Sequence, residues 1–242
     1  MQKTLSALTL FLSLSIAGWS SPCPTGQTLN FYITNFNNPT GCTIGNLVYN
    51  NFSYIGAGVL APAVLASGVT VVPLTSVHDF GFDFQANWSV SPVLVAPASQ
   101  TSTIGYTARE MFNLSEIKDL DLGFVGSRTG GLTPLGGTIA IDETVCLNGL
   151  ILGGCLGGIQ TTLGVFANSL GVQLDATLLI NPQVSQIDVL KVLVIDSGTS
   201  GSASVSSFSN TTDSVPEPMT LSLIGTGLLG LGIMKKRRRQ RS

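Results

Sequence analysis

The chain has 242 residues and 11 basic side chains. Seven of the basic side chains belong to Lys3 and to six residues between 235 and 241. The rest of the chain has four basic against 13 acidic residues, a formal net charge of −9. Nucleic acid and anionic membrane surfaces repel such a body, so we expect no nucleic-acid partner. Sparse charge with many Gly, Ser, Thr and Asn residues favours an extracellular β-protein over a cytosolic enzyme.

The first 20 residues have the organisation of a secretory signal peptide. Lys3 gives a positive start, and a mainly apolar stretch runs from Leu5 to Ile16. Small residues ending at Ala17 and at Ser20 mark two candidate cleavage sites. The apolar stretch is too short for a permanent membrane span. We therefore predict a signal peptide over residues 1–20 that signal peptidase removes.

All four cysteines lie in the part that is predicted to be exported: Cys23, Cys42, Cys146 and Cys155. An even number in a secreted chain indicates disulfides, and the sequence lacks the Cys-x-x-Cys pairs or clustered histidines that favour a metal site. Four cysteines allow three connectivities. We favour Cys23 with Cys42 and Cys146 with Cys155, because both bonds close short loops.

Residues 22–45 are rich in Pro, Asn and Gly, which predicts an irregular entry segment. After it, β-branched and aromatic residues predict a series of short strands separated by turns. These strands cover 47–55, 69–72, 80–85, 103–111, 117–125, 138–146, 163–170, 172–180, 185–195 and 202–208. No long stretch has helical periodicity. We therefore predict an all-β fold, with one antiparallel β-sandwich over 21–208 and a polar linker over 209–214.

Three of these strands show the period of two that is typical of a strand with one buried face. The residues that share one face are Phe80, Phe82 and Phe84 in the first, and Ile104, Tyr106 and Ala108 in the second. In the third, Leu120, Leu122 and Phe124 share one face, while Ile117 falls on the other with Asp119 and Asp121.

The strongest indication of an enzyme is the sequence Asp196-Ser197-Gly198-Thr199, which follows an apolar strand. An aspartic protease uses such a sequence at a strand end, where two carboxylates share a proton. The chain has no second copy, although a homodimer would supply one, and Asp-Ser-Gly is also an ordinary turn sequence. We predict no catalytic residue, and keep an extracellular hydrolase that uses Asp196 on a plain single-pass anchor as the alternative.

Three further patterns in the sequence are weaker indications of chemistry. His78 adjoins Asp79, but no Gly-x-Ser-x-Gly nucleophile accompanies them. Four carboxylates are potential Ca²⁺ ligands without EF-hand spacing, namely Asp119, Asp121, Asp142 and Glu143, and we predict neither a metal nor another cofactor. Among four Asn-x-Ser/Thr sequences, Asn210 is the candidate modification site, because the predicted linker exposes it.

The C-terminal segment has three parts with different physical roles. Pro216-Glu217-Pro218 interrupts regular structure, because proline has no N–H and restricts the residue before it. Residues 219–234 are uncharged and would span about 24 Å as a helix, slightly less than the roughly 30 Å hydrocarbon core. The basic residues that follow keep the end in the cytoplasm, and they are Lys235, Lys236, Arg237, Arg238, Arg239 and Arg241.

This order of elements closely resembles the PEP-CTERM sorting signal of Gram-negative bacteria, which here occupies residues 215–242. The resemblance implies recognition by an exosortase, a transpeptidase-like membrane enzyme, and association with exopolysaccharide or biofilm matrix. It also implies an inner-membrane-anchored precursor that later reaches the cell surface or the extracellular matrix. A plain single-pass anchor would share the apolar span and the basic cluster, but not the Pro-Glu-Pro directly before them.

The body, too, resembles a recurrent type of PEP-CTERM protein ectodomain through short motifs. They include the residues from Cys42 to Leu47, Ile104-Gly105-Tyr106, and the stretch from Glu143 to Cys146. The resemblance implies a β-rich exported domain and no known reaction. The sequence therefore predicts a non-catalytic structural or adhesive body on a sorting signal.

Overall fold

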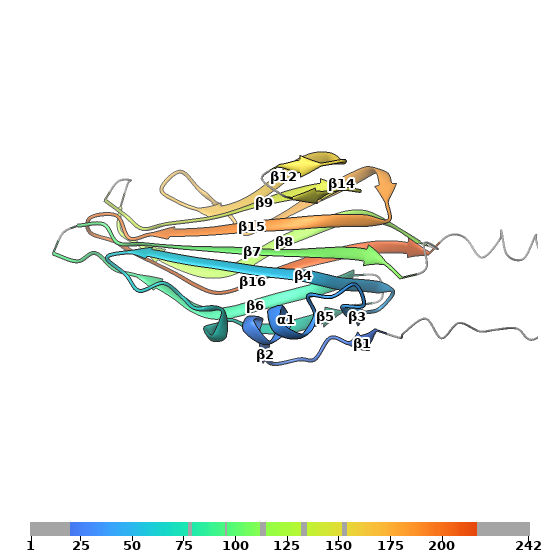
Figure 1. Cartoon of the computed structure of the whole chain (residues 1–242). Helices are drawn as coiled ribbons and strands as arrows, with labels where there is room; N and C mark the ends of the chain where they lie inside the picture. Colours follow the sequence, from blue (N-terminus) through green and yellow to red (C-terminus); the bar gives the residue numbers. More distant parts are fainter. Residues whose placement is uncertain are drawn as a thin grey trace, which may run out of the picture.

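Two β-sheets packed face to face form the body of the protein (Figure 1). The structure, a computed structural model, describes residues 20–76, 79–94, 96–111, 115–131, 135–151 and 154–216. Within these ranges the strands form an eight-stranded sheet, a six-stranded sheet and a short hairpin. The described strand pairs are antiparallel except for the short pair of β1 with β3. The predicted all-β, sandwich-like fold is confirmed.

The eight-stranded sheet contains the strands that carry most of the aliphatic core. In spatial order they are β1 (Ser21–Pro22), β3 (Cys42–Ile44), β4 (Leu47–Val59), β7 (Ser99–Glu110), β15 (Gln186–Asp196), β9 (Thr138–Leu147), β12 (Ile159–Ala167) and β13 (Val172–Gln173). Their inward residues pack against the second sheet.

The six-stranded sheet covers the other side of the core. In spatial order it contains β14 (Asp175–Val184), β8 (Ser115–Thr129), β16 (Ser202–Pro216), β6 (Asp79–Val90), β5 (Thr70–Thr75) and β2 (Gln27–Thr28). The remaining elements are the hairpin of β10 (Leu150–Ile151) and β11 (Cys155–Leu156), the helix α1 (Leu29–Asn35) and the 3₁₀ turn η1 (Ala66–Gly68).

The period-two patterns identify the buried faces correctly. Phe82 and Phe84 are buried in β6, and the predicted faces of β7 and β8 are buried as well. Ile117 is the exception, because it is fully buried although the pattern placed it opposite Leu120. The pairing of β8 with β16 shifts register at this point, so Ile117 lies opposite Ser214 while Asp119 lies opposite Asp213. The extra residue in β8 returns Ile117 to the core side.

The entry segment contains a helix that the composition did not predict. Thr28 caps α1 by accepting a hydrogen bond from the Phe31 amide (3.3 Å). Leu29 and Tyr32, one turn apart, are fully buried, and the Tyr32 hydroxyl donates to the Pro24 carbonyl at 2.5 Å. A helix of seven residues is too short to be stable alone. Packing of its buried face on the sheets therefore decides its formation.

The predicted linker over 209–214 is wrong. These residues continue β16, which runs to Pro216 with β8 on one side and β6 on the other. Asn210 is fully buried, so the sequence-based expectation of an exposed modification site at this residue is wrong too. Two of the polar side chains that suggested a linker, Asn210 and Ser214, donate hydrogen bonds inside the body, and Asp213 pairs with Lys118.

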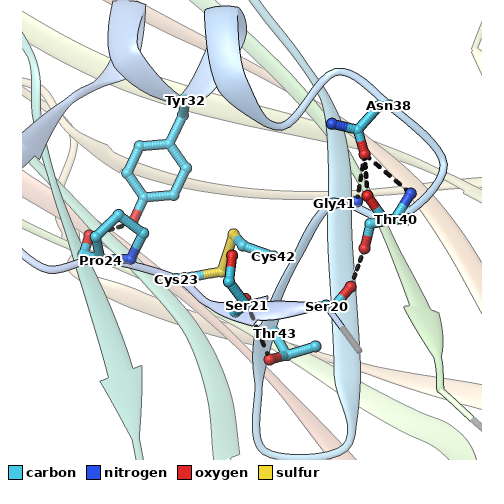
Figure 2. The surroundings of a disulfide bond; sticks show 10 residues. All are labelled: Ser20, Ser21, Cys23, Pro24, Tyr32, Asn38, Thr40, Gly41, Cys42 and Thr43. Atoms are coloured by element: carbon cyan, nitrogen blue, oxygen red, sulfur yellow. Dashed lines mark hydrogen bonds between the residues drawn. A yellow bond between two sulfur atoms is a disulfide. The ribbon is translucent and has the colours of Figure 1, made fainter. Parts of the chain in front are cut away.

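Two disulfides join the cysteines that lie close together in the sequence, so the favoured connectivity is confirmed. Cys23 pairs with Cys42, and Figure 2 shows this bond close to the Tyr32 ring of α1. Cys146 pairs with Cys155 and closes the glycine-rich segment that contains the β10–β11 hairpin. The first bond ties the entry segment to the edge of the eight-stranded sheet.

Removing the two disulfides separately is expected to destabilise the body unequally. Cross-linking limits the unfolded chain more when the loop is longer, and the sequence separations are 19 and 9 residues. Replacing Cys23 and Cys42 by serine should cost about 3 kcal/mol, and replacing Cys146 and Cys155 about 2.5 kcal/mol. Denaturant unfolding of the purified protein measures both losses. A larger loss from the second pair would contradict the loop-length explanation.

Among the described residues, no helix combines the length and the apolar character that crossing a bilayer requires. Residues 1–19 of the predicted signal peptide and the whole predicted membrane span (219–234) lie outside the described residues.

Candidate functional site

The C-terminal junction, residues Ser214 to Pro216, belongs to the last strand of the sheet. Val215 pairs with Glu116, and Pro216 pairs with Ser115 at the start of β8. The Ser214 hydroxyl donates to the Asn46 side-chain oxygen at 2.9 Å. Glu217 and Pro218 of the sorting motif and the basic cluster lie outside the described residues. The strand therefore leads into the predicted sorting motif without a spacer.

The beginning and the end of the described chain lie at the same end of the sandwich (Figure 1). Ser21 pairs with Cys42 in β3, and Asn46, which contacts Ser214, stands in the turn that joins β3 to β4. The turn that follows β15 lies at the other end of the sandwich (Figure 1). The C-terminal junction therefore lies at the end of the body where the described chain begins.

A second feature is the core polar cluster, which consists of Tyr106, Glu143, Lys191 and Asn210. The first three stand on β7, β9 and β15 of the eight-stranded sheet, and Asn210 stands on β16 of the facing sheet. All four side chains are buried, with exposures of 0–1%. Lys191 lies directly opposite Glu143 in the strand pairing, so both side chains point into the same layer of the core.

Hydrogen bonds connect the four side chains of the core polar cluster. The Lys191 Nζ donates to Glu143 Oε2. The Asn210 Nδ2 lies 3.1 Å from Oε2 and 3.2 Å from Oε1 of Glu143, and 3.0 Å from the Asp121 carbonyl oxygen. The Tyr106 hydroxyl donates to Asn210 Oδ1. The amide of Asn210 is therefore held at both its oxygen and its nitrogen.

Burial changes the protonation of this cluster. Desolvation lowers the pKa of the Lys191 ammonium to about 8, although the Glu143 carboxylate opposes this change. Desolvation likewise raises the pKa of Glu143, against the attraction of Lys191. Both shifts weaken the preference of the two groups for their charged forms. Burial also raises the pKa of Tyr106 well above its usual value, so its hydroxyl remains a hydrogen-bond donor.

Asp196 stands in the turn that ends β15. Its Oδ1 accepts a hydrogen bond from the Gly198 amide at 2.7 Å, and Gly198 has a φ of +63°. The Ser197 hydroxyl is buried and accepts from the Ala98 amide at 2.9 Å. These are the contacts of an Asp-Ser-Gly turn that ends β15.

The four carboxylates considered as Ca²⁺ ligands do not converge. Glu143 lies in the core polar cluster, whereas Asp142 is exposed on the outer face of β9. Asp121 accepts from the Thr177 hydroxyl, and Asp119 faces Lys118, which pairs with Asp213. Within the described ranges, no three His, Cys, Asp or Glu side chains gather where they could hold a metal ion. His78 lies outside the described residues.

Sequence reasoning missed the core polar cluster, although part of it was legible. In β9, Glu143 takes the inward position between Ile141 and Val145, and in β15 Lys191 takes the inward position between Val189 and Leu193. Charged residues are almost never fully buried unless they are paired. A charged residue on the apolar face of each of two strands thus predicts a buried pair. The third member, Asn210, could not be predicted because its segment was assigned to the linker.

Comparison with family models identifies the PEP-CTERM protein-sorting motif at residues 214–239. The match begins at Ser214, inside β16, and covers the segment that resembles this signal in the sequence. No curated protein sequence matches the chain.

Two solved structures are distantly similar to the fold. The structure of TmCBM61 in complex with β-1,4-galactotriose has 12% identity and a TM-score of 0.30, over 68% of this chain and 88% of that chain. The enzymatically active domain of bacteriophage CBA120 tailspike protein 4 has 13% identity and a TM-score of 0.22, over 69% of this chain and 19% of that chain.

Proposed function

Because the chain carries a PEP-CTERM protein-sorting motif, we propose that it is exported as a membrane-anchored precursor that an exosortase sorts to the cell envelope or the extracellular matrix. The observation that carries the proposal is the motif match over 214–239, which begins in the last strand of a disulfide-bonded β-body and continues beyond it. Disulfides suit a compartment outside the cytoplasm. Signal peptidase and the exosortase are the expected processing partners.

The strand pairing of the C-terminal junction supports processing beyond Pro216. The backbone of Ser214, Val215 and Pro216 is paired with β8, so it is part of the sheet and not free to enter an active site. A processing enzyme needs an accessible, extended backbone, which begins after this pairing ends. Proline at 216 and 218 keeps the intervening residue out of a helix. We therefore propose that a short extended segment separates the body from the predicted membrane span.

The proposed role of the body is structural or adhesive, with exopolysaccharide or biofilm matrix as its environment. The contact of Asp196 with the Gly198 amide is that of an ordinary Asp-Ser-Gly turn, which requires no catalytic role. The excess of negative charge favours a neutral or cationic partner over nucleic acid. No observation in the described residues favours the hydrolase alternative.

Replacing Pro216-Glu217-Pro218 by three alanines is expected to block sorting without blocking membrane insertion. The apolar span and the basic cluster stay intact, so the precursor should insert as before. The variant loses the extended break, and we expect it to accumulate in the inner membrane at precursor length. Membrane fractionation and mass measurement in a host with the exosortase test this result.

Two controls make this experiment specific. Thr211→Ala changes an outward residue of β16 just before the motif and should be processed like the unmodified protein. A host without the exosortase should leave every version at precursor length. Equal processing and release of the triple-alanine variant would favour a plain membrane anchor and overturn the sorting proposal.

A further inference from the structure

The core polar cluster is costly if it serves only as packing. Two charged groups, Lys191 and Glu143, are withdrawn completely from water. Desolvation of such a pair often exceeds the gain from its attraction, and apolar residues of similar volume are commonly at least as stabilising. The arrangement of the four side chains, however, places a nucleophile, an acyl group and a proton carrier together.

Lys191 has the properties of an activated amine nucleophile. Its Nζ is fully buried, and desolvation lowers its pKa to about 8, which increases the neutral fraction. A lysine in an apolar pocket gains nucleophilicity in this way. Its Nζ also lies 5.8 Å from the centroid of the Tyr106 ring, and that ring packs in turn against other aromatic side chains.

The Asn210 side chain has the properties of an oriented and polarised acyl group. The Tyr106 hydroxyl donates to its carbonyl oxygen, which is where negative charge develops when an amine adds to the carbon. Its Nδ2, the leaving nitrogen, is bound by Glu143. Lys191 Nζ and Asn210 Nδ2 share the Oε2 atom of Glu143, so the amine and the amide meet at one carboxyl group.

Glu143 can move the protons that this addition requires. It contacts both the attacking and the leaving nitrogen, which is the position of a general acid and base. Burial raises the pKa of Glu143, so the carboxyl group can hold a proton and deliver it within the core. Water, which would otherwise compete for the acyl carbon, is excluded from this site because all four side chains are buried.

We propose that the side chains of Lys191 and Asn210 become joined by an intramolecular isopeptide bond, and that the folded body forms this bond by itself. The lone pair of Nζ forms a bond to Cγ of Asn210, and the Cγ–Nδ2 bond breaks. Glu143 accepts one proton from Nζ and delivers one to Nδ2, which leaves as ammonia. One amine and one carboxamide thus yield one secondary amide and one ammonia molecule, without an oxidant or a cofactor, and Glu143 ends unchanged.

The bond would connect the two sheets across the core. Lys191 lies in β15 of the eight-stranded sheet, and Asn210 lies in β16, the strand that leads into the sorting motif. Tension or digestion that begins at the C-terminal end meets β16 first. A covalent link at Asn210 passes this load into the centre of the opposite sheet and keeps β16 in place. This property suits a protein that is held or passed on through its C-terminal end.

Mass spectrometry of the purified full chain, after reduction and alkylation of the disulfides, tests the bond. We expect a mass lower by one ammonia molecule than the sequence with the same processing requires. Trypsin should also fail to cleave after Lys191, so residues 129–191 remain joined to those that follow. A second protease should release a branched peptide in which Lys191 is linked to Asn210.

Two outcomes of this measurement would overturn the proposal. A mass equal to that of the sequence, with normal cleavage after Lys191, would show a static ion pair. A loss of water instead of ammonia, with Lys191 joined to Glu143, would show a different bond. The cross-link requires only the folded body, so it should form in hosts with or without an exosortase, and its failure is distinguishable from a failure of the sorting proposal.

Two variants assign the roles of Glu143 and Tyr106. Glu143→Gln keeps the size of the side chain but cannot carry protons, so the variant should have the full sequence mass and normal cleavage after Lys191. Tyr106→Phe keeps the ring and removes one hydroxyl, so pulse-labelled protein should be cross-linked more slowly and still fold, which buried Trp88 fluorescence can verify. Cross-linking of Glu143→Gln at the normal rate would refute the proton-carrying role.

Discussion

Thr211→Pro is expected to prevent the body from reaching its native structure. Thr211 lies in β16 between Gly81 of β6 and Asp121 of β8, and its side chain points away from the core. Because β16 has a strand on each side, the Thr211 amide faces one of these strands. Proline removes the amide donor and places its ring between the two strands. A carbonyl of the neighbouring strand that loses its donor costs about 1–3 kcal/mol, and the steric clash of the proline ring adds to this cost.

The comparison with Thr211→Ala isolates this backbone effect. Alanine also removes the outward side chain but keeps the amide, so its stability should be close to that of the unmodified protein. The exported amount of each protein and the denaturant midpoint of the purified body measure the difference. Stability of Thr211→Pro equal to that of Thr211→Ala would restore a linker over 209–214, because only an unpaired segment tolerates proline there.

Phe82→Ala is expected to have the second-largest effect, because Phe82 is the centre of an aromatic cluster between the sheets and α1. Its ring is fully buried and lies 4.7 Å from that of Tyr49, 5.6 Å from that of Phe52 and 5.7 Å from that of Tyr32, measured between centroids. Removing such a ring leaves a cavity that the surrounding sheets cannot close. The expected loss is about 3–5 kcal/mol, out of a total of about 5–15 kcal/mol for a typical domain.

Phe80→Ala provides a matched control on the same strand and face. Phe80 is only partly buried, and its carbonyl oxygen, which accepts from the Tyr49 hydroxyl at 2.9 Å, is retained in the variant. Trp88 is buried, and the sequence has one other tryptophan, Trp19, so the fluorescence of a body that starts at residue 21 follows unfolding through Trp88. A smaller loss for Phe82→Ala than for Phe80→Ala would contradict the central position of the Phe82 ring.

The sequence alone determined the features that depend on local patterns. Period-two alternation predicted strands such as β6 and β7, because each residue of a strand faces one of two sides regardless of its neighbours. The sorting motif was legible for the same reason, since the break at Pro216, the apolar span and the basic cluster are contiguous. Short sequence separation also indicated the pairing of the cysteines.

Tertiary structure alone decided where the polar residues of the last strand belong. Ser209 to Ser214 has the composition of a linker, and no local pattern shows that Asn210 can be satisfied in a core. Its partners Tyr106 and Glu143, together with Lys191, which donates to Glu143, come from three strands of the opposite sheet that are distant in the sequence. A buried polar group is stable only when its partners are in place. The fold that brings these partners together therefore determines whether this segment is a linker or a central strand.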